Sequence, residues 1–232
     1  MQLPPEFVPV VLILTVSGLL IVTGLRKQPG IGVLAAVLLV AATLRLRGEG
    51  PDAIGFSFPE DWSAAVLRGL GYGVLLQILA AVFVGPLSEK ITGTVHDHSI
   101  FDGIRGNWKA LFLWLAMVWT LVAVLEEGIF RGFLMTEIAK VVGTGPAGLV
   151  FNVLFTSAVF GLSHGYQNLS GVVTAGTIGL LLGCIFISSG FNLWQAIFTH
   201  GFVDTVGIVV IFSGCDRHIE YFVRRKIWRG RI

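Results

Sequence analysis

Charged residues are scarce in this chain of 232 residues. Asp, Glu, Lys and Arg make up 13%, about half the share usual for a soluble domain, whereas hydrophobic residues make up 54%. This balance excludes a soluble globular protein, a disordered chain and a nucleic-acid-binding module. Cysteine is also rare. Cys184 and Cys215 both lie in or beside apolar runs, which argues against a disulfide framework. The class of protein that remains is a polytopic membrane protein.

The alternation of apolar and polar residues that marks a transmembrane β-barrel is missing, because the apolar runs are continuous. A helix needs about 20 apolar residues to cross a bilayer. Seven runs are candidate spans: Phe7–Leu25, Ile31–Leu44, Gly69–Leu87, Ala110–Leu125, Val150–Leu162, Leu169–Ile187 and Leu193–Phe212. We therefore predict an all-α, polytopic transmembrane helical bundle with about seven spans, within a range of six to eight. Residues 1–232 are expected to form a single integral membrane domain.

Three of these runs have uncertain limits. Ile31–Leu44 is short, so it suits an interfacial or tilted segment as well as a span. Val150–Leu162 becomes a full span if it continues to Leu169, and the fourth run could slide to Trp114–Leu134. With these limits, Glu126, His164 and His200 lie within about 10 Å of the midplane.

The distribution of Lys and Arg predicts the orientation. Arg26 and Lys27 follow the first run and should stay in the cytoplasm by the positive-inside rule. Seven spans then place the N-terminus outside and the C-terminus inside, where the basic tail 216–232 is expected to touch anionic lipid. Residues 1–6 lack Lys and Arg, so no basic signal-peptide segment is expected there. We expect a multi-pass protein of a bacterial plasma membrane with a cytoplasmic C-terminus.

Six ionisable residues lie within the apolar segments, where a charge costs at least ~2.5–3.5 kcal/mol. They are Glu126, Glu127, Arg131, His164, His200 and Asp204. Intramembrane ionisable residues are functional candidates by default. Glu127 and Arg131 are four residues apart and can pair on one helix face, so a purely structural ion pair stays open for them. Glu126 points away from that face and needs another partner.

The two histidines lie on separate runs. Asp204 follows His200 by four residues and can orient its imidazole. A carboxylate and two imidazoles that converge in a cavity inside the bundle suit the activation of water, which indicates hydrolysis, most naturally of a peptide bond. Ser163 precedes His164, but adjacent helix residues do not face each other, so a Ser–His dyad is not expected.

Three spaced motifs occur in order along the chain. Glu126–Arg131 fits E-E-x-x-x-R, Phe160–His164 fits F-x-x-x-H, and His200–Asp204 fits H-x-x-x-N/D. As an ordered set over 111–212, they resemble the signatures of the CPBP family of intramembrane proteases. That family includes the type II CAAX prenyl endopeptidases and the bacterial Abi-type bacteriocin-processing or immunity proteins.

The resemblance implies roles for the charged residues. Glu126 would be the general base that activates water, and His164 would help to hold that water. Glu127 and Arg131 would support the site. The implied function is an intramembrane endopeptidase that acts on a membrane-associated protein or peptide. Its expected partners are this substrate and the lipid bilayer, and no nucleic acid is expected to bind.

The resemblance also implies that His200 and residue 204 stabilise the oxyanion. The familiar eukaryotic members have Asn at the last position, whereas this chain has Asp204. An ionised Asp cannot donate a hydrogen bond, so Asp204 would be protonated, orient His200 or ligate a metal. The family is classed with metalloproteases, which makes Glu126, His164 and His200 candidate zinc ligands. A glutamate-activated water without metal is the other interpretation.

Two further function classes stay open. The first is a non-enzymatic immunity or binding scaffold of the same fold. The second is an ion or proton transporter, because chains of Asp, Glu and His also serve as relays; the lack of an evident internal repeat argues against it. His96 and His98 form an H-x-H pair in the polar connection 93–107, and a lone pair of this kind is more often solvated than metal-bound.

Overall fold

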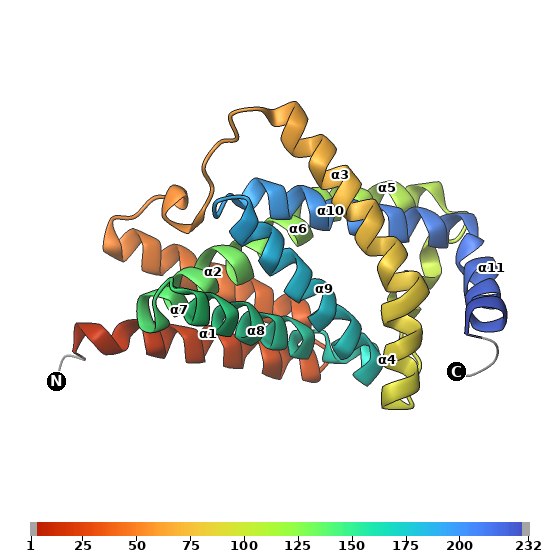
Figure 1. The fold of residues 1–232 in the computed structure, drawn as a ribbon, viewed down its shortest axis with the longest axis horizontal. Helices are drawn as coiled ribbons and strands as arrows, with labels where there is room; N and C mark the ends of the chain where they lie inside the picture. The colour runs from red at the N-terminus through yellow and green to blue at the C-terminus, as the bar shows by residue number, and fades with distance from the viewer. Residues whose placement is uncertain (1–3, 229–232) are drawn as a thin grey trace.

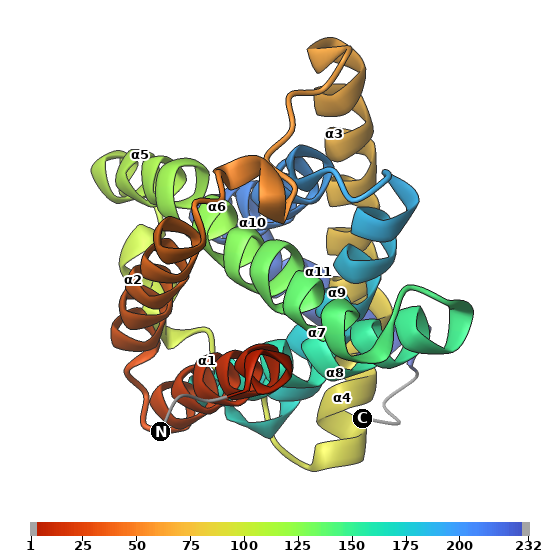
Figure 2. The same cartoon turned by 90° about the vertical axis from the view of Figure 1, so that its left-hand side faces the viewer.

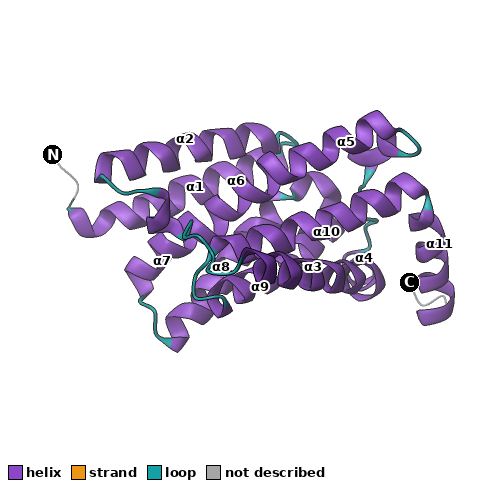
Figure 3. Cartoon of the chain, turned by 90° about the horizontal axis from the view of Figure 1, so that it is seen from above, coloured by secondary structure: helices purple, strands orange, loops and turns teal. Residues whose placement is uncertain are grey.

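The computed structural model describes residues 4–228, so Arg229 and Arg231 of the basic tail lie outside the described residues. Within this range every regular element is a helix and no strand occurs (Figure 3). Seven helical segments are long and apolar enough to cross a membrane. The predicted all-α bundle with about seven spans is confirmed.

Five of the seven candidate spans consist of one α-helix, with a short 3₁₀ turn before one of them. They are α1 (Val8–Leu25), α2 (Pro29–Arg47), α8 (Pro146–Ser163), α9 (Asn168–Ser188, preceded by the 3₁₀ turn Gly165–Gln167) and α10 (Leu193–Ser213). The other two are longer and contain π-helical turns. The third span comprises α3 (Trp62–Leu79), the π turn Ala80–Val84 and α4 (Gly85–Thr92). The fourth comprises α5 (Trp108–Met117), the π turn Val118–Val122, α6 (Ala123–Glu127), the π turn Gly128–Leu134 and α7 (Met135–Val142).

Short elements complete the chain. 3₁₀ turns occupy Pro5–Phe7, Pro51–Ile54 and Ser99–Ile104. After the last span come α11 (Cys215–Phe222) and the π turn Val223–Ile227. An ion pair between Arg105 and Asp216 ties α11 to the polar connection, and the guanidinium lowers the pKa of the Asp216 carboxyl.

The structure resolves the limits of the short runs. The second run extends to the 19 residues of α2, so it has the length and hydropathy of a span. The fifth run reaches 18 residues because α8 begins earlier, at Pro146. The alternative, in which this run continues as one helix to Leu169, does not occur. The chain leaves the helix at His164 (φ −92°, ψ 18°) and turns at Asn168, the first residue of α9, which has a φ of +67°. A residue with this φ cannot lie in the interior of an α-helix.

Glycines bring neighbouring spans close together. A Cβ atom on Gly69 would lie 2.4 Å from Cβ of Phe198, and one on Gly73 would lie 2.9 Å from the carbonyl oxygen of Thr199. These two glycines are four residues apart on α3 and face α10, the small-residue spacing that allows membrane helices to approach closely. Gly24 plays the same part between α1 and α8, next to Ser163.

Different turns and helix ends lie at the two ends of the bundle. The α1–α2 turn, the end of α4, the α8–α9 turn and α11 lie toward one end, at the right of Figure 1. The α7–α8 turn, the α9–α10 turn and the beginning of α3 lie toward the left and the top of the same view. We refer to these as the α11 end and the α7–α8 end.

Candidate active site

The fourth span carries the two glutamates near its middle. Glu126 and Glu127 close α6, and the π turn Gly128–Leu134 follows directly. Figure 2 shows α5, α6 and α7 as one long helix across the middle of the bundle. π turns inside α-helices occur frequently at functional sites. Glu127 is 0% and Arg131 is 1% exposed, so the pair is fully buried.

Glu127 and Arg131 together connect the fourth span to α9 and α10. The Oε1 atom of Glu127 accepts hydrogen bonds from Nη1 of Arg131 and from Nδ1 of His200 on α10, each at 2.7 Å. Arg131 also donates from Nη2 to the carbonyl oxygen of Gly179 on α9, at 2.9 Å. Its guanidinium lies over the Phe160 ring, 4.6 Å from the centroid, within the range of a cation–π interaction. Arg131 therefore neutralises Glu127 and fixes its position.

His200 is oriented by Glu127 more closely than by Asp204. The distance from Nε2 of His200 to Oδ2 of Asp204 is 3.6 Å, which is longer than a hydrogen bond. Asp204 is next to His200 as expected from the i,i+4 spacing, but the short hydrogen bond of His200 is made with Glu127 on α6. No local pattern in the sequence indicated that contact, because Glu127 and His200 are 73 residues apart.

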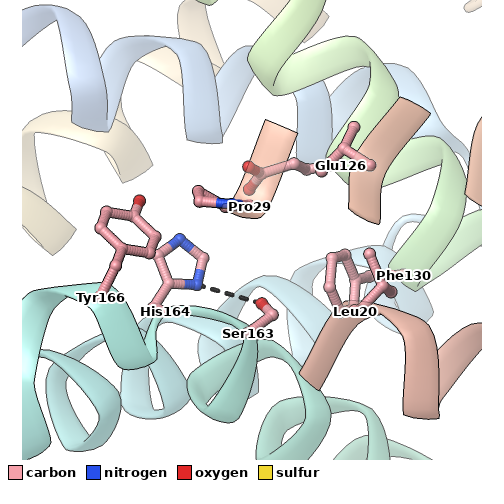
Figure 4. Close-up of a pocket in the computed structure, with 8 residues that line it drawn as sticks. Leu20, Pro29, Glu126, Phe130, Ser163, His164 and Tyr166 are labelled. Carbon is pink, nitrogen blue, oxygen red and sulfur yellow. Dashed lines mark hydrogen bonds between the residues drawn. The ribbon is translucent and has the colours of Figure 1, made fainter. Parts of the chain in front are cut away.

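Glu126 stands apart from this network. Its Oε2 atom is buried and has no hydrogen-bond partner among the described residues. The side chain faces a cavity of about 20 Å³ that it shares with His164 (Figure 4). The remaining lining residues are Leu20, Pro29, Val33, Phe130, Ser163 and Tyr166. One water molecule needs ~10–15 Å³, so the cavity has room for a single water beside the unpartnered carboxylate oxygen.

His164 caps the C-terminal end of α8 and presents one nitrogen to this cavity. Its Nδ1 atom lies 2.8 Å from the carbonyl oxygen of Phe160. Because a carbonyl only accepts, Nδ1 carries the proton and donates it there, which leaves Nε2 free. Figure 4 shows His164 and Tyr166 on one side of the cavity and Glu126 on the other.

Ser163 lies closer to His164 than the sequence suggested. Its hydroxyl is 3.3 Å from Nδ1 of His164, because His164 has left the helix and its side chain turns back. The expectation that the two side chains do not meet is wrong. The Nδ1 atom already carries a proton, however, and the hydroxyl donates to the Phe160 carbonyl at 2.7 Å. The pair is therefore not arranged as a nucleophile with its base.

The donor atoms do not converge as metal ligands do. Among residues 4–228, no three His, Cys, Asp or Glu side chains form a group that could hold a metal ion. Of the three candidates, His200 directs Nδ1 to Glu127 and Nε2 toward Asp204. A zinc site needs at least three protein ligands around one point. Glu126, His164 and His200 therefore do not fit a zinc ion in this arrangement.

The H-x-H pair lies outside the cavity but close to the turn that holds His164. The rings of His96 and His98 stack with their centroids 4.0 Å apart. His98 is exposed, whereas His96 is partly buried and its Nε2 lies 3.2 Å from Oε1 of Gln167. Burial, together with the neighbouring His98, lowers the pKa of His96 to about 4. His96 thus supports the α8–α9 turn.

Tyr166 was missed by sequence reasoning. It lines the cavity two residues after His164, and its hydroxyl accepts a hydrogen bond from Nε2 of Gln167 at 3.2 Å. None of the three motifs contains it. The only signal was a tyrosine in an apolar segment close to a candidate histidine.

The fold and the buried polar residues define a class: an integral, multi-pass membrane protein with an internal acid–histidine site. Within that class, residues 108–206 match the family model described as type II CAAX prenyl endopeptidase Rce1-like. The match spans all six candidate residues and confirms the resemblance. It supports a peptidase of the CAAX-type intramembrane protease kind. No curated protein and no solved structure matches the chain.

Proposed function

We propose that this protein is an intramembrane endopeptidase that hydrolyses a peptide bond of a membrane-associated protein or peptide with water activated by Glu126. The observation that supports this most directly is the buried, unpartnered Oε2 atom of Glu126 at a cavity large enough for one water. A general base must lie within hydrogen-bond reach of the proton it removes. A water molecule in this cavity would lie within hydrogen-bond reach of Glu126.

The water would lie between Glu126 and the free Nε2 atom of His164. As its oxygen attacks the scissile carbonyl, Glu126 takes one proton, and the carbonyl oxygen becomes an oxyanion. Glu126 then gives that proton to the departing amine, so that one water is consumed and a carboxyl and an amino terminus are formed. The protein's part is to hold the water and the base in place before the reaction.

His200 would stabilise the oxyanion. The bond from Nδ1 to Glu127 fixes the ring, and Nε2 donates to an oxyanion when it carries a proton. The Asp204 side chain beside it is 30% exposed, whereas the Glu126–His164 cavity is only large enough for water. We therefore propose that the substrate carbonyl approaches on the Asp204 side of His200.

The cavity also has a position along the bundle. Pro29 begins α2, Ser163 ends α8, and His164 and Tyr166 belong to the α8–α9 turn, so the cavity lies toward the α11 end. By the positive-inside argument that end faces the cytoplasm. We propose that substrates reach the site from the cytoplasmic leaflet. A reporter fused after Ile232 should then read as cytoplasmic, and an external signal would contradict the orientation.

The test is hydrolysis by purified protein in liposomes. Synthetic peptides, with and without a lipid anchor, are incubated in ¹⁸O-labelled water, and ¹⁸O in new carboxyl termini is measured by mass spectrometry. The wild type should incorporate ¹⁸O, and Glu126→Gln should lower the rate by at least ~10²-fold. Glu49→Gln is the matched control, since Glu49 is exposed and far along the chain from the motifs.

Cells provide the second measurement. The termini of membrane proteins are compared between strains that carry wild-type protein or Glu126→Gln at equal membrane levels. Termini present only with the wild type identify substrates. Equal cleavage by both proteins would overturn the proposed base. A cellular function that persists with Glu126→Ala, without any cleavage, would favour the scaffold alternative.

A further inference from the structure

A second, larger cavity lies away from the candidate active site, toward the α7–α8 end. It has a volume of about 690 Å³ and lies between the segment that leads into α3, the end of α9 and the beginning of α10. Its lining is Phe58, Pro59, Glu60, Asp61, Ala64, Ala65, Arg68, Tyr72, Ser188, Ser189, Asn192 and Gln195. Small-molecule sites typically measure ~300–1,000 Å³. None of the six candidate catalytic residues lines it.

Arg68 is the positively charged residue in the lining of this cavity. It lies in the first two turns of α3, within an apolar span, and its neighbour Leu67 is 66% exposed. No carboxylate in the described part of the chain forms an ion pair with it. Its Nε atom donates to Oε1 of Gln195 at 3.2 Å. The two terminal nitrogens remain available, and the Gln195 contact limits the directions in which they can point.

Gln195 supplies the second donor. It is only 5% exposed, and its Nε2 atom has no hydrogen-bond partner among the described residues. Its Oε1 atom is held by Arg68. Buried amide groups are normally hydrogen-bonded, and a buried one without a partner calls for an explanation. A ligand that brings an anionic oxygen to Arg68 and Gln195 would satisfy both side chains.

The same cavity carries negative charge. Glu60 and Asp61 lie just before α3, and Oδ1 of Asp61 accepts the backbone N–H of Ala64 at 3.0 Å. A ligand with only negative charge would be repelled by these carboxylates, and a ligand with only positive charge would be repelled by Arg68. A group that carries an anion and an ammonium close together matches both parts of the lining.

The aromatic residues around the cavity indicate its depth in the membrane. The rings of Trp62 and Trp194 lie 5.1 Å apart, and Phe58 lies 5.9 Å from Trp62. Tryptophan is enriched at the level of the lipid headgroups. Leu67 and Leu75, further along α3, are 66% and 61% exposed and offer apolar surface for acyl chains. A ligand at this depth is more naturally a lipid than a solute.

We propose that this cavity binds the headgroup of a phospholipid that carries a phosphate and a primary ammonium. The phosphate accepts hydrogen bonds from Arg68 and from Nε2 of Gln195. The ammonium donates to Glu60 and Asp61, and the acyl chains lie along the exposed leucines of α3. The site is separate from the Glu126–His164 cavity, and the proposal does not depend on the proposed proteolysis.

Lipid binding by the purified, delipidated protein tests this proposal. Native mass spectrometry measures the affinity for phosphatidylethanolamine, for phosphatidylglycerol and for the soluble headgroup O-phosphoethanolamine. Wild type should bind phosphatidylethanolamine most tightly. Arg68→Gln should weaken that binding by about tenfold or more, the effect of a lost charge-assisted hydrogen bond. Arg45→Gln, which removes an exposed charge at the end of α2, should leave it unchanged.

A second variant tests the ammonium subsite. Glu60→Gln should weaken phosphatidylethanolamine binding and leave phosphatidylglycerol binding unchanged or tighter. Thermal melting of each variant confirms that the fold is intact. Three outcomes would overturn the proposal: equal binding by Arg68→Gln and wild type, tighter binding of phosphatidylglycerol than of phosphatidylethanolamine by wild type, or binding of O-phosphoethanolamine as tight as that of the lipid.

Discussion

The Nδ1 atom of His200 lies 2.7 Å from Oε1 of Glu127, the same oxygen to which Arg131 donates. One carboxylate oxygen therefore fixes a histidine on α10 and an arginine in the following π turn. The neighbouring glutamate, Glu126, has no such partners and faces the small cavity. Two adjacent residues of the same type thus occupy different environments, and their substitutions should have different effects.

Glu127→Gln should reduce both stability and activity. The substitution leaves the buried Arg131 charge without its partner, and breaking a buried pair costs ~3–5 kcal/mol. We expect a lower melting temperature in detergent and reduced membrane levels, together with lost cleavage. Glu126→Gln is the matched comparison and should melt like the wild type. Normal levels and normal cleavage by Glu127→Gln would show that the pair is not buried.

Ser163→Ala and His164→Ala should differ strongly. The Ser163 hydroxyl donates to the Phe160 carbonyl, so its loss should change the cleavage rate by no more than a few-fold. Loss of His164 removes the nitrogen that faces the water cavity and should lower the rate by at least ~10²-fold. The rates are measured with the same peptide in liposomes. An inactive but folded Ser163→Ala protein would restore the serine nucleophile as a candidate.

Asp204→Asn should keep substantial activity. The carboxylate lies 3.6 Å from Nε2 of His200, and Asn can both accept from His200 and donate to an oxyanion. His200→Ala should instead lose ~10²–10³-fold, the cost of a missing oxyanion donor. Each variant is assayed with and without added zinc. If Asp204→Asn is inactive without zinc and recovers with it, Asp204 is a metal ligand.

Gly24→Ala should disturb the turn that holds His164. A Cβ atom at Gly24 would lie 2.0 Å from the carbonyl oxygen of Ser163, so one backbone must move. Overpacking of this kind costs ~1–3 kcal/mol, and we expect lower thermal stability and slower cleavage. Gly18→Ala is the control on the same helix, because nothing lies within 4 Å of its Cβ position. Equal stability of the two variants would contradict the close α1–α8 approach.

Acidification should loosen the connection 93–107. In the folded protein the pKa of His96 is about 4, below its ordinary value of 6.5, because burial disfavours the charged form. Between these two pH values the unfolded connection binds more protons than the folded one, so its stability falls as the pH decreases through this window. The His98 ring stacks on His96 and is partly desolvated there, which lowers the pKa of His98 and acts in the same direction.

Hydrogen exchange of residues 93–107 at pH 7 and pH 5, corrected for intrinsic rates, measures this effect. Protection in the wild type should be lower at pH 5. The difference should shrink in a His96→Asn, His98→Asn double variant and persist in His218→Asn, whose residue lies in α11. Protection that is independent of pH in the wild type would contradict the burial of His96.

The spans and the motif residues could be predicted from the sequence because their signals are local. Continuous apolar runs specify membrane helices, and each apolar run found in the sequence corresponds to a candidate span in the structure. The cost of charge in an apolar segment singled out the six ionisable residues. The family match over residues 108–206 agrees with the ordered motifs.

The limits of α8 depended on backbone geometry that hydropathy does not encode. Residues 163–169 are apolar enough to continue a helix, yet the chain turns at His164 and Asn168. This turn brings Ser163 beside His164 and places His164 at a helix end. A helical continuation would have directed the two side chains apart.

The sequence by itself determined the class of the protein, the number of candidate spans and the residues proposed to carry its chemistry. Only the tertiary structure decided that Glu127 holds His200 and that Glu126 faces a water-sized cavity with His164. The physical reason is that helical periodicity relates residues within one turn or two, whereas these contacts join spans distant in the chain. They depend on how closely the helices approach, which glycines such as Gly24 and Gly69 permit.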